Sequence, residues 1–140
     1  MSLISIIIPM RDAEPFVADT LRSLLAQEDI PIEIIVVDDG STDRSIDVVK
    51  SFNDPRIRMI AGPRCGISAA FNAGLAQARG EHLCRCDADD LYPTGRLSGQ
   101  AAFLTEHPEF GVVCGSYSTI DSASPISRAS AFSRLSKSVA

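Results

Sequence analysis

The chain has 140 residues, of which 45% are hydrophobic and 22% are charged. This size and composition predict one globular domain and exclude a mostly disordered chain. Thirteen Lys and Arg residues against eighteen Asp and Glu residues give a net charge of −5, which argues against nucleic acid as a partner.

The first half of the chain alternates strand-like and helix-like patterns. Residues 3–8 form a nearly continuous β-branched run, which is typical of a strand buried on both faces. Apolar residues at helical spacing over 17–25 predict a helix, and residues 34–37 predict a second buried strand. A helix with Ser41 as its expected N-cap follows.

The second half continues this alternation. Gly80 is expected at the position just after a helix, where glycine is favoured. Strands are expected over 57–61, 82–86 and 110–114, and helices over 67–78 and 97–104. Strands that alternate with helices predict an α/β fold, a Rossmann-like, mostly parallel sheet with helices on both faces.

Membrane and redox signals are weak. No apolar run approaches the roughly 20 residues of a membrane-spanning helix, and the N-terminal run is too short for the core of a signal peptide. We therefore expect a cytoplasmic protein, or one peripheral to the cytoplasmic face of a membrane. The four cysteines are expected to be buried, reduced thiols, because no second pair completes a zinc site.

Two acidic clusters, residues 38–43 and 87–90, directly follow the second and fourth predicted strands. Ligands of open parallel sheets bind beyond the carboxyl ends of the strands. Asp87 and Asp89 are separated by one residue, so both side chains can leave the same face of the strand as it ends. Together they can hold Mg²⁺ or Mn²⁺ and leave coordination positions open for phosphate oxygens. The other cluster suits a base or ribose. For Asp43, capping is the favoured interpretation.

Four stretches with these features occur in a recognisable order and spacing. They are Ser5–Pro9, Ile34–Asp43, Gly66–Gly74 and Ala78–Asp90. Across about residues 3–121 the chain resembles the family 2 glycosyltransferases, which have the GT-A fold. The resemblance implies an inverting transferase of polysaccharide biosynthesis. The enzyme would use a nucleotide diphosphate sugar, usually a UDP-sugar, a saccharide or lipid-linked acceptor, and a divalent metal, Mg²⁺ or Mn²⁺.

The resemblance also implies roles for particular residues. Pro9 would line the base pocket, and Asp39 would accept a hydrogen bond from the pyrimidine ring. Asp87 would contact the ribose or the water shell of the metal, and Asp89 would ligate the metal. Asp38 would help to shape the nucleoside pocket.

The sequence departs from the family pattern at three places. Phe71 stands where an arginine is common, so a phosphate or base contact is either lost or supplied by Arg64. Arg11 and Asp12 stand where many members have an aromatic residue and an asparagine. The general base and the acceptor-binding segments of the family lie beyond the expected fifth strand.

We therefore expect residues 1–115 to be a nucleotide-sugar-binding domain. The serine-rich residues 116–140 would be a tail or the start of an acceptor-binding half, with the general base beyond the chain end. The tail, or a second copy of the chain in a homodimer, is expected to cover apolar surface near the fifth strand. The alternative is a truncated nucleotide-binding or assembly module without independent catalytic activity.

Overall fold

A computed structural model describes residues 2–120, which divide between Thr94 and Gly95 into two compact units. The first unit contains a four-stranded sheet in the order β3-β2-β1-β4, in which every neighbouring pair is parallel. The strands are β1 (Ile4–Met10), β2 (Ile32–Asp38), β3 (Ile57–Ala61) and β4 (His82–Arg85). The predicted parallel α/β sheet is confirmed, and its first four strands are found where expected.

The core of the sheet is β1, whose seven residues are all buried. It pairs with β2 along its whole length on one side and with β4 over residues 4–7 on the other, so it lies inside the sheet. The register places Met10, the last residue of β1, opposite Asp38, the last residue of β2. Both strands therefore end at the same edge of the sheet.

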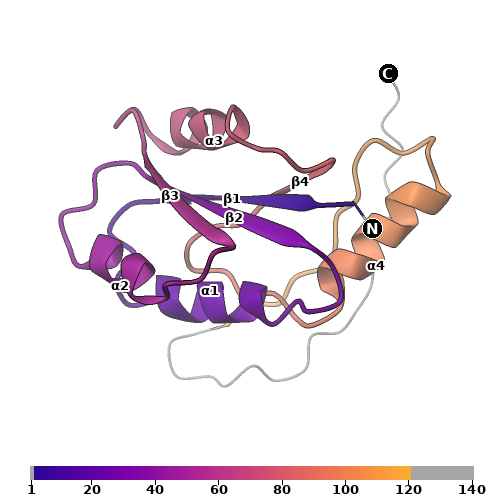
Figure 1. Cartoon of the computed structure of the whole chain (residues 1–140), viewed down its shortest axis with the longest axis horizontal. Coiled ribbons are helices and arrows are strands. Elements are labelled where there is room, and N and C mark those ends of the chain that lie inside the picture. The colour runs from indigo at the N-terminus through magenta and orange to yellow at the C-terminus, as the bar shows by residue number, and fades with distance from the viewer. Residues whose placement is uncertain (1, 121–140) are drawn as a thin grey trace. The chain divides into compact units, whose positions relative to one another are not determined.

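Helices cover both faces of this sheet, as predicted. Figure 1 shows α3 (Ile67–Leu75) on one face, and α1 (Val17–Leu25) and α2 (Ser45–Ser51) on the opposite face. In α1, Val17, Leu21 and Leu24 are fully buried. In α3, Ala70 joins a core cluster with residues of β1 and β2, which are Ile7, Ile35 and Val37.

The predicted start of the second helix is wrong. Helix α2 begins at Ser45, and Ser41 instead accepts a hydrogen bond on its Oγ from the Asp12 amide at 3.0 Å. The carboxylate of Asp43 accepts hydrogen bonds from the amide and the hydroxyl of Ser45. The hydrogen bond from the amide is 2.9 Å long. Asp43 therefore holds the first residue of the helix, but the N-cap is Arg44, whose side chain makes no capping hydrogen bond.

Gly80 does not follow the end of a helix, because α3 already ends at Leu75. A side chain at Gly80 would place its Cβ 2.6 Å from the Ser5 nitrogen and 2.7 Å from the Leu3 oxygen. Glycine is therefore needed there because the chain passes directly against β1 as it enters β4.

The second unit contains α4 (Arg96–Glu106), close to its predicted range. Phe103, in the last turn of this helix, has its ring centroid 4.4 Å from that of His107 and 5.6 Å from that of Phe110. The predicted strand over 110–114 is wrong: these residues form no strand, and Val112 is 61% exposed. A short apolar run becomes a strand only where a neighbouring strand accepts its hydrogen bonds, and none pairs with it among residues 2–120.

The expected tail falls largely outside the described residues. Residues 116–120 belong to neither a helix nor a strand, and residues 121–140 lie outside the part that the structure describes. No helix within residues 2–120 is long and apolar enough to cross a membrane.

All four cysteines are free thiols, but the prediction that they are buried is wrong for most of them. Only Cys86 is buried, whereas Cys65 and Cys114 are exposed and Cys84 is intermediate. Cys65 and Cys114 lie outside the helices and strands, where apolar composition alone does not enforce burial.

A buried carboxylate joins the sheet at the end opposite to Met10 and Asp38. Glu33 of β2 has a side chain only 7% exposed. It accepts hydrogen bonds from the Ser5 hydroxyl at 2.6 Å and from the Arg79 amide and Nη2 at 2.7 and 2.8 Å. Burial opposes its ionisation, yet the hydrogen bonds from Ser5 and Arg79 outweigh burial and lower the pKa of Glu33.

We predict that Glu33→Gln lowers the free energy of unfolding by roughly 1–3 kcal/mol, because the new amide group would face donors that now meet a carboxylate. Urea denaturation at neutral pH measures the change, and exposed Glu81→Gln is the matched control. A loss no larger than that of the control would contradict the role of the buried carboxylate.

The same group makes stability depend on pH. Because the folded-state pKa of Glu33 lies below its ordinary value of 4.5, its contribution is present above pH 4.5. The contribution is lost as the pH falls through the lower, folded-state pKa. The difference in stability between the wild type and Glu33→Gln should therefore shrink below pH 4.5.

Candidate functional site

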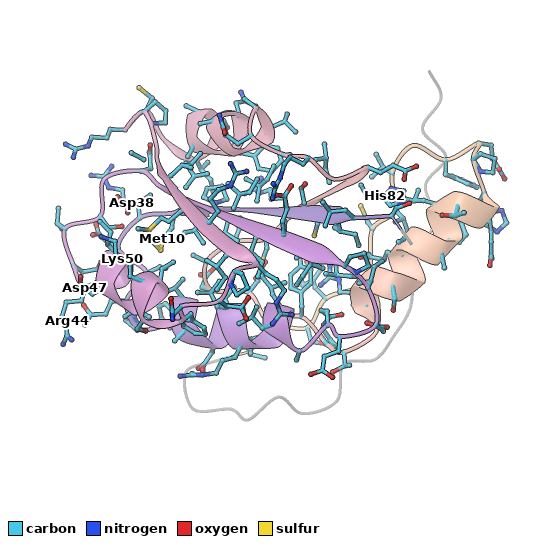
Figure 2. All side chains as sticks on the ribbon, viewed as in Figure 1. Met10, Asp38, Arg44, Asp47, Lys50 and His82 are labelled. Carbon is cyan, nitrogen blue, oxygen red and sulfur yellow. The ribbon has the colours of Figure 1, made fainter. Side chains whose placement is uncertain are left out.

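A cleft of about 520 Å³ opens where β1, β2 and β4 end. Its lining comes from the segments that follow these strands and from the start of α3: Pro9, Met10, Arg11, Asp12, Ala13, Phe16, Asp39, Gly66, Ile67, Ala70, Asp87, Ala88 and Asp89. Figure 2 shows Met10 and Asp38 at this end of the sheet, and His82, the first residue of β4, at the other end. Of the predicted site residues, Pro9, Asp39, Asp87 and Asp89 come together here.

Asp39 is the buried polar group of the cleft, with 4% of the residue exposed. Its Oδ1 accepts a hydrogen bond from the Arg64 amide at 2.6 Å, and its Oδ2 accepts one from the Gly66 amide at 2.8 Å. One side chain after β2 therefore fixes the segment between β3 and α3. Each oxygen still has a second acceptor site.

The fixed segment is closely fitted to Asp39. A side chain at Gly62 would place its Cβ 2.8 Å from Asp39 Oδ1, and the Gly62 amide donates to the Asp38 carbonyl at 2.7 Å. Arg64 adopts a φ of 58°, a conformation that is unfavourable for a residue with a side chain. The hydrogen bond that its amide donates to Asp39 supports this conformation.

Asp38 and Arg64 do not belong to the cleft lining. The carboxylate of Asp38 accepts hydrogen bonds from the amides of Gly40 and Ser41 at 3.4 and 3.2 Å, which shapes the turn after β2. The side chain of Arg64 lies beside Gly40, where an added Cβ would meet it at 3.2 Å. Both residues are neighbours of the cleft lining.

The segment after β1 is joined to the segment after β2 by reciprocal hydrogen bonds. Asp12 Oδ1 accepts a hydrogen bond from the Thr42 amide at 2.7 Å, and Asp43 Oδ2 accepts one from the Glu14 amide at 3.0 Å. The Ala13 amide donates to Ser45 Oγ at 2.8 Å. The Thr42 amide is the main reason that the pKa of Asp12 is lowered, and the Ser45 hydroxyl lowers that of Asp43.

The acidic pair after β4 is more open. Asp87 Oδ1 pairs with Arg85, whose Nε and Nη2 lie at 3.1 and 3.0 Å. Asp89 is exposed, and no ion pair within residues 2–120 includes it. The backbone between them is fixed to α1, because Thr20 Oγ1 donates to the Ala88 carbonyl at 2.9 Å.

The carboxylates of Asp87 and Asp89 fit a divalent cation whose remaining coordination positions are taken by a ligand. Exposed carboxylate oxygens are suitable for Mg²⁺ or Mn²⁺. Within the described residues no group of three or more His, Cys, Asp or Glu side chains is placed to hold a metal. Asp87 and Asp89 would therefore leave coordination positions for water and for oxygens of a bound molecule. Asp89 suits direct ligation better, since Arg85 competes for Asp87.

The structure adds cleft residues that sequence patterns did not single out as ligands. Arg11 and Asp12 were noted only as departures from the family pattern, although both line the cleft. Phe16 and Ile67 also line it, at 47% and 51% exposed. Ile67 belongs to the apolar stripe predicted over 67–78, which indicates burial equally well, whereas Phe16 lies just outside the stripe predicted over 17–25.

The family model for glycosyl transferase family 2 matches residues 5–139, nearly the whole chain. The chain belongs to this family. Solved glycosyltransferase structures are also similar to this chain, which confirms the GT-A fold expected from the sequence.

Three relatives show the extent of the likeness. The Escherichia coli glucosyltransferase WfaP, named for UDP-Glc and α-D-GlcNAc-diphosphoundecaprenol, is 35% identical over 79% of this chain and 44% of its own length. S. aureus TarS, solved with UDP-GlcNAc, is 32% identical with a TM-score of 0.68, over 75% of this chain and 32% of that chain.

The third relative is the mannosyltransferase PcManGT from Pyrobaculum calidifontis, solved with GDP-Man and Mn²⁺. It is 27% identical with a TM-score of 0.71, over 79% of this chain and 34% of that chain. The chain spans 44% or less of the length of the curated relatives compared with it, and only 9% of the Pasteurella multocida chondroitin synthase.

We predict that Asp39→Asn increases hydrogen exchange by about 5- to 150-fold at the Arg64 amide or at the Gly66 amide, because asparagine offers only one acceptor oxygen to these two donors. Exchange measured by NMR tests this, with exposed Asp47→Asn on α2 as the control. Unchanged protection at both amides would show that Asp39 does not hold the segment.

Proposed function

We propose that this chain is the donor-binding part of an inverting glycosyltransferase. It binds a nucleotide diphosphate sugar, with a UDP-sugar as the donor. Residues 1–115 form the nucleotide-sugar-binding domain, and residues 116–140 lead toward an acceptor-binding part. The acceptor is a saccharide or a lipid-linked saccharide, as in polysaccharide biosynthesis.

One observation carries the proposal: a single cleft, in a chain of this family, joins Asp39 to Asp87 and Asp89. Asp39 and Pro9 would hold the base, and Asp87 the ribose or a metal-bound water. Asp89 would hold Mg²⁺ or Mn²⁺ directly. When bound, the metal would stabilise negative charge on the departing diphosphate.

The charge of the cleft supports a cation as part of donor binding. Four aspartates line it, and Arg11 is the only cationic residue among the described residues that do so. A diphosphate entering this site meets carboxylates that repel it, unless positive charge lies between them. The Mn²⁺ in the PcManGT complex is consistent with this interpretation.

The identity of the donor and acceptor is supported by the relatives. UDP-GlcNAc is present in the TarS complex, and the name of WfaP contains UDP-Glc and a lipid diphosphate carrying GlcNAc. Inverting transfer also requires a base that deprotonates the acceptor hydroxyl. We place that base outside the cleft residues described above, in the acceptor-binding part.

We predict that UDP binds more tightly in Mn²⁺ than in EDTA, and that Asp89→Ala removes most of this difference. The affinity in Mn²⁺ should fall by about tenfold or more, because the variant loses a direct metal ligand. Isothermal titration calorimetry measures both effects. Asp90→Ala is the matched control, since Asp90 is equally exposed but does not line the cleft.

Equal affinity in Mn²⁺ and EDTA would contradict the metal site. A larger loss for Asp90→Ala than for Asp89→Ala would contradict the assignment of the ligand within this acidic cluster.

We also predict that the site prefers UDP to CDP by about 5- to 150-fold. Uracil presents an N3–H that the Asp39 carboxylate can accept, whereas cytosine presents a bare N3 acceptor that would face it. Competition between the two nucleotides at fixed Mn²⁺ measures the preference, and Asp39→Asn should reduce it. The ratio of affinities separates this effect from any general loosening of the segment that Asp39 holds. Indistinguishable affinities for the wild type would remove Asp39 from the base pocket.

A further inference from the structure

Two large apolar side chains are exposed inside a cleft that four aspartates and Arg11 also line. Phe16 is 47% exposed and Ile67 is 51% exposed, and both line the cleft. Ligand sites combine apolar walls with a few placed polar groups. These two side chains are therefore candidates for contact with the apolar faces of a bound molecule.

Phe16 belongs to the end of the cleft formed by the segment after β4. Its carbonyl accepts a hydrogen bond from the Thr20 amide at 3.2 Å, and Thr20 Oγ1 donates to the Ala88 carbonyl at 2.9 Å. Ala88 lies between the two carboxylates of the proposed metal site. Phe16 is the residue immediately before α1, and it lines the cleft.

Ile67 belongs to the other end. It follows Gly66, whose amide is held by Asp39 Oδ2 at 2.8 Å. The backbone positions of the two residues are thus linked to different parts of the cleft: Ile67 follows a residue held by Asp39, and Phe16 is linked through Thr20 to Ala88.

We propose that Phe16 is a specificity-determining residue whose ring packs against the hexose of the donor. This inference rests on the proposed function. In a nucleotide sugar the hexose is attached to the diphosphate at the end away from the base. Asp89 is the proposed ligand of the metal at the diphosphate, so a side chain near Ala88 and Asp89 meets the hexose, whereas one near Asp39 meets the nucleoside.

The chemistry of the ring suits this contact. One face of a pyranose presents mainly carbon-bound hydrogens, which carry slight positive charge and little affinity for water. The face of a phenyl ring is electronegative and apolar, so it covers such a surface favourably. Phe16 has only two side-chain torsions and a backbone held by hydrogen bonds, so little freedom is lost on binding.

The test compares UDP with UDP-N-acetylglucosamine as ligands of the whole chain in Mn²⁺, by isothermal titration calorimetry. For Phe16→Ala, the affinity for UDP should stay within about twofold of the wild type. The affinity for UDP-N-acetylglucosamine should fall by a further factor of about 2 to 10. Phe16→Tyr keeps the ring and should restore the wild-type ratio, whereas Phe16→Leu keeps apolar bulk without a ring and should not.

Two control variants sharpen the result. Ile67→Ala should weaken both ligands by the same factor, because it lies at the nucleoside end. Leu75→Ala removes an exposed apolar side chain of α3 that does not line the cleft, and should change neither affinity. Circular dichroism checks that every variant is folded, and the Tyr and Leu variants decide the outcome if Phe16→Ala is not.

Three outcomes would overturn the inference. Equal losses for both ligands would place Phe16 against the nucleotide, and no loss for either would place it outside the site. A wild-type ratio for Phe16→Leu would show that the ring is not what the sugar contacts. In all three cases UDP still binds the wild type, so the proposed function stands. Failure of the wild type to bind UDP would instead overturn the proposed function, and this inference with it.

Discussion

The parallel pairing of β1 with β2 and β4 is the constraint on which the cleft depends. Because all three strands run in one direction, the segments that leave them emerge at one edge of the sheet. Every residue of β1 is buried, so this strand can shift neither along its neighbours nor outward without exposing its apolar side chains. Residues about 50 positions apart, such as Asp39 and Asp89, therefore line one cleft.

Two buried carboxylates, Glu33 and Asp39, then hold the segments that the sheet brings together. Glu33 joins β1 and β2 to the segment before β4 at one end of the sheet, and Asp39 fixes the segment before α3 at the other. In both cases a side chain satisfies backbone amides that neither a helix nor a strand would satisfy. Leaving such amides unpaired in a buried place is costly, so each carboxylate stabilises one particular path of the chain.

The sequence predicted the parts of this structure that repeat with a regular period. Continuous apolar runs located β1 and β2, and helical spacing located α1 and α4. The acidic clusters were expected at one sheet edge because their positions relative to the strands determine it. The prediction of a strand over 110–114 was wrong. Strand formation depends on a neighbouring strand, and a local sequence pattern does not show whether one is present.

The remaining features depend on contacts between segments distant in the sequence. Asp12 and Thr42 are 30 residues apart, and Asp39 and Gly66 are 27 apart, so no local pattern pairs them. Phe16 illustrates the difference most clearly. Its sequence neighbour Val17 is fully buried and begins the helix predicted over 17–25, whereas periodicity says nothing about Phe16. Only the bond between Thr20 and Ala88 shows that the first turn of α1 lies against the segment carrying Asp87 and Asp89, so that an exposed ring there faces a ligand rather than bulk solvent.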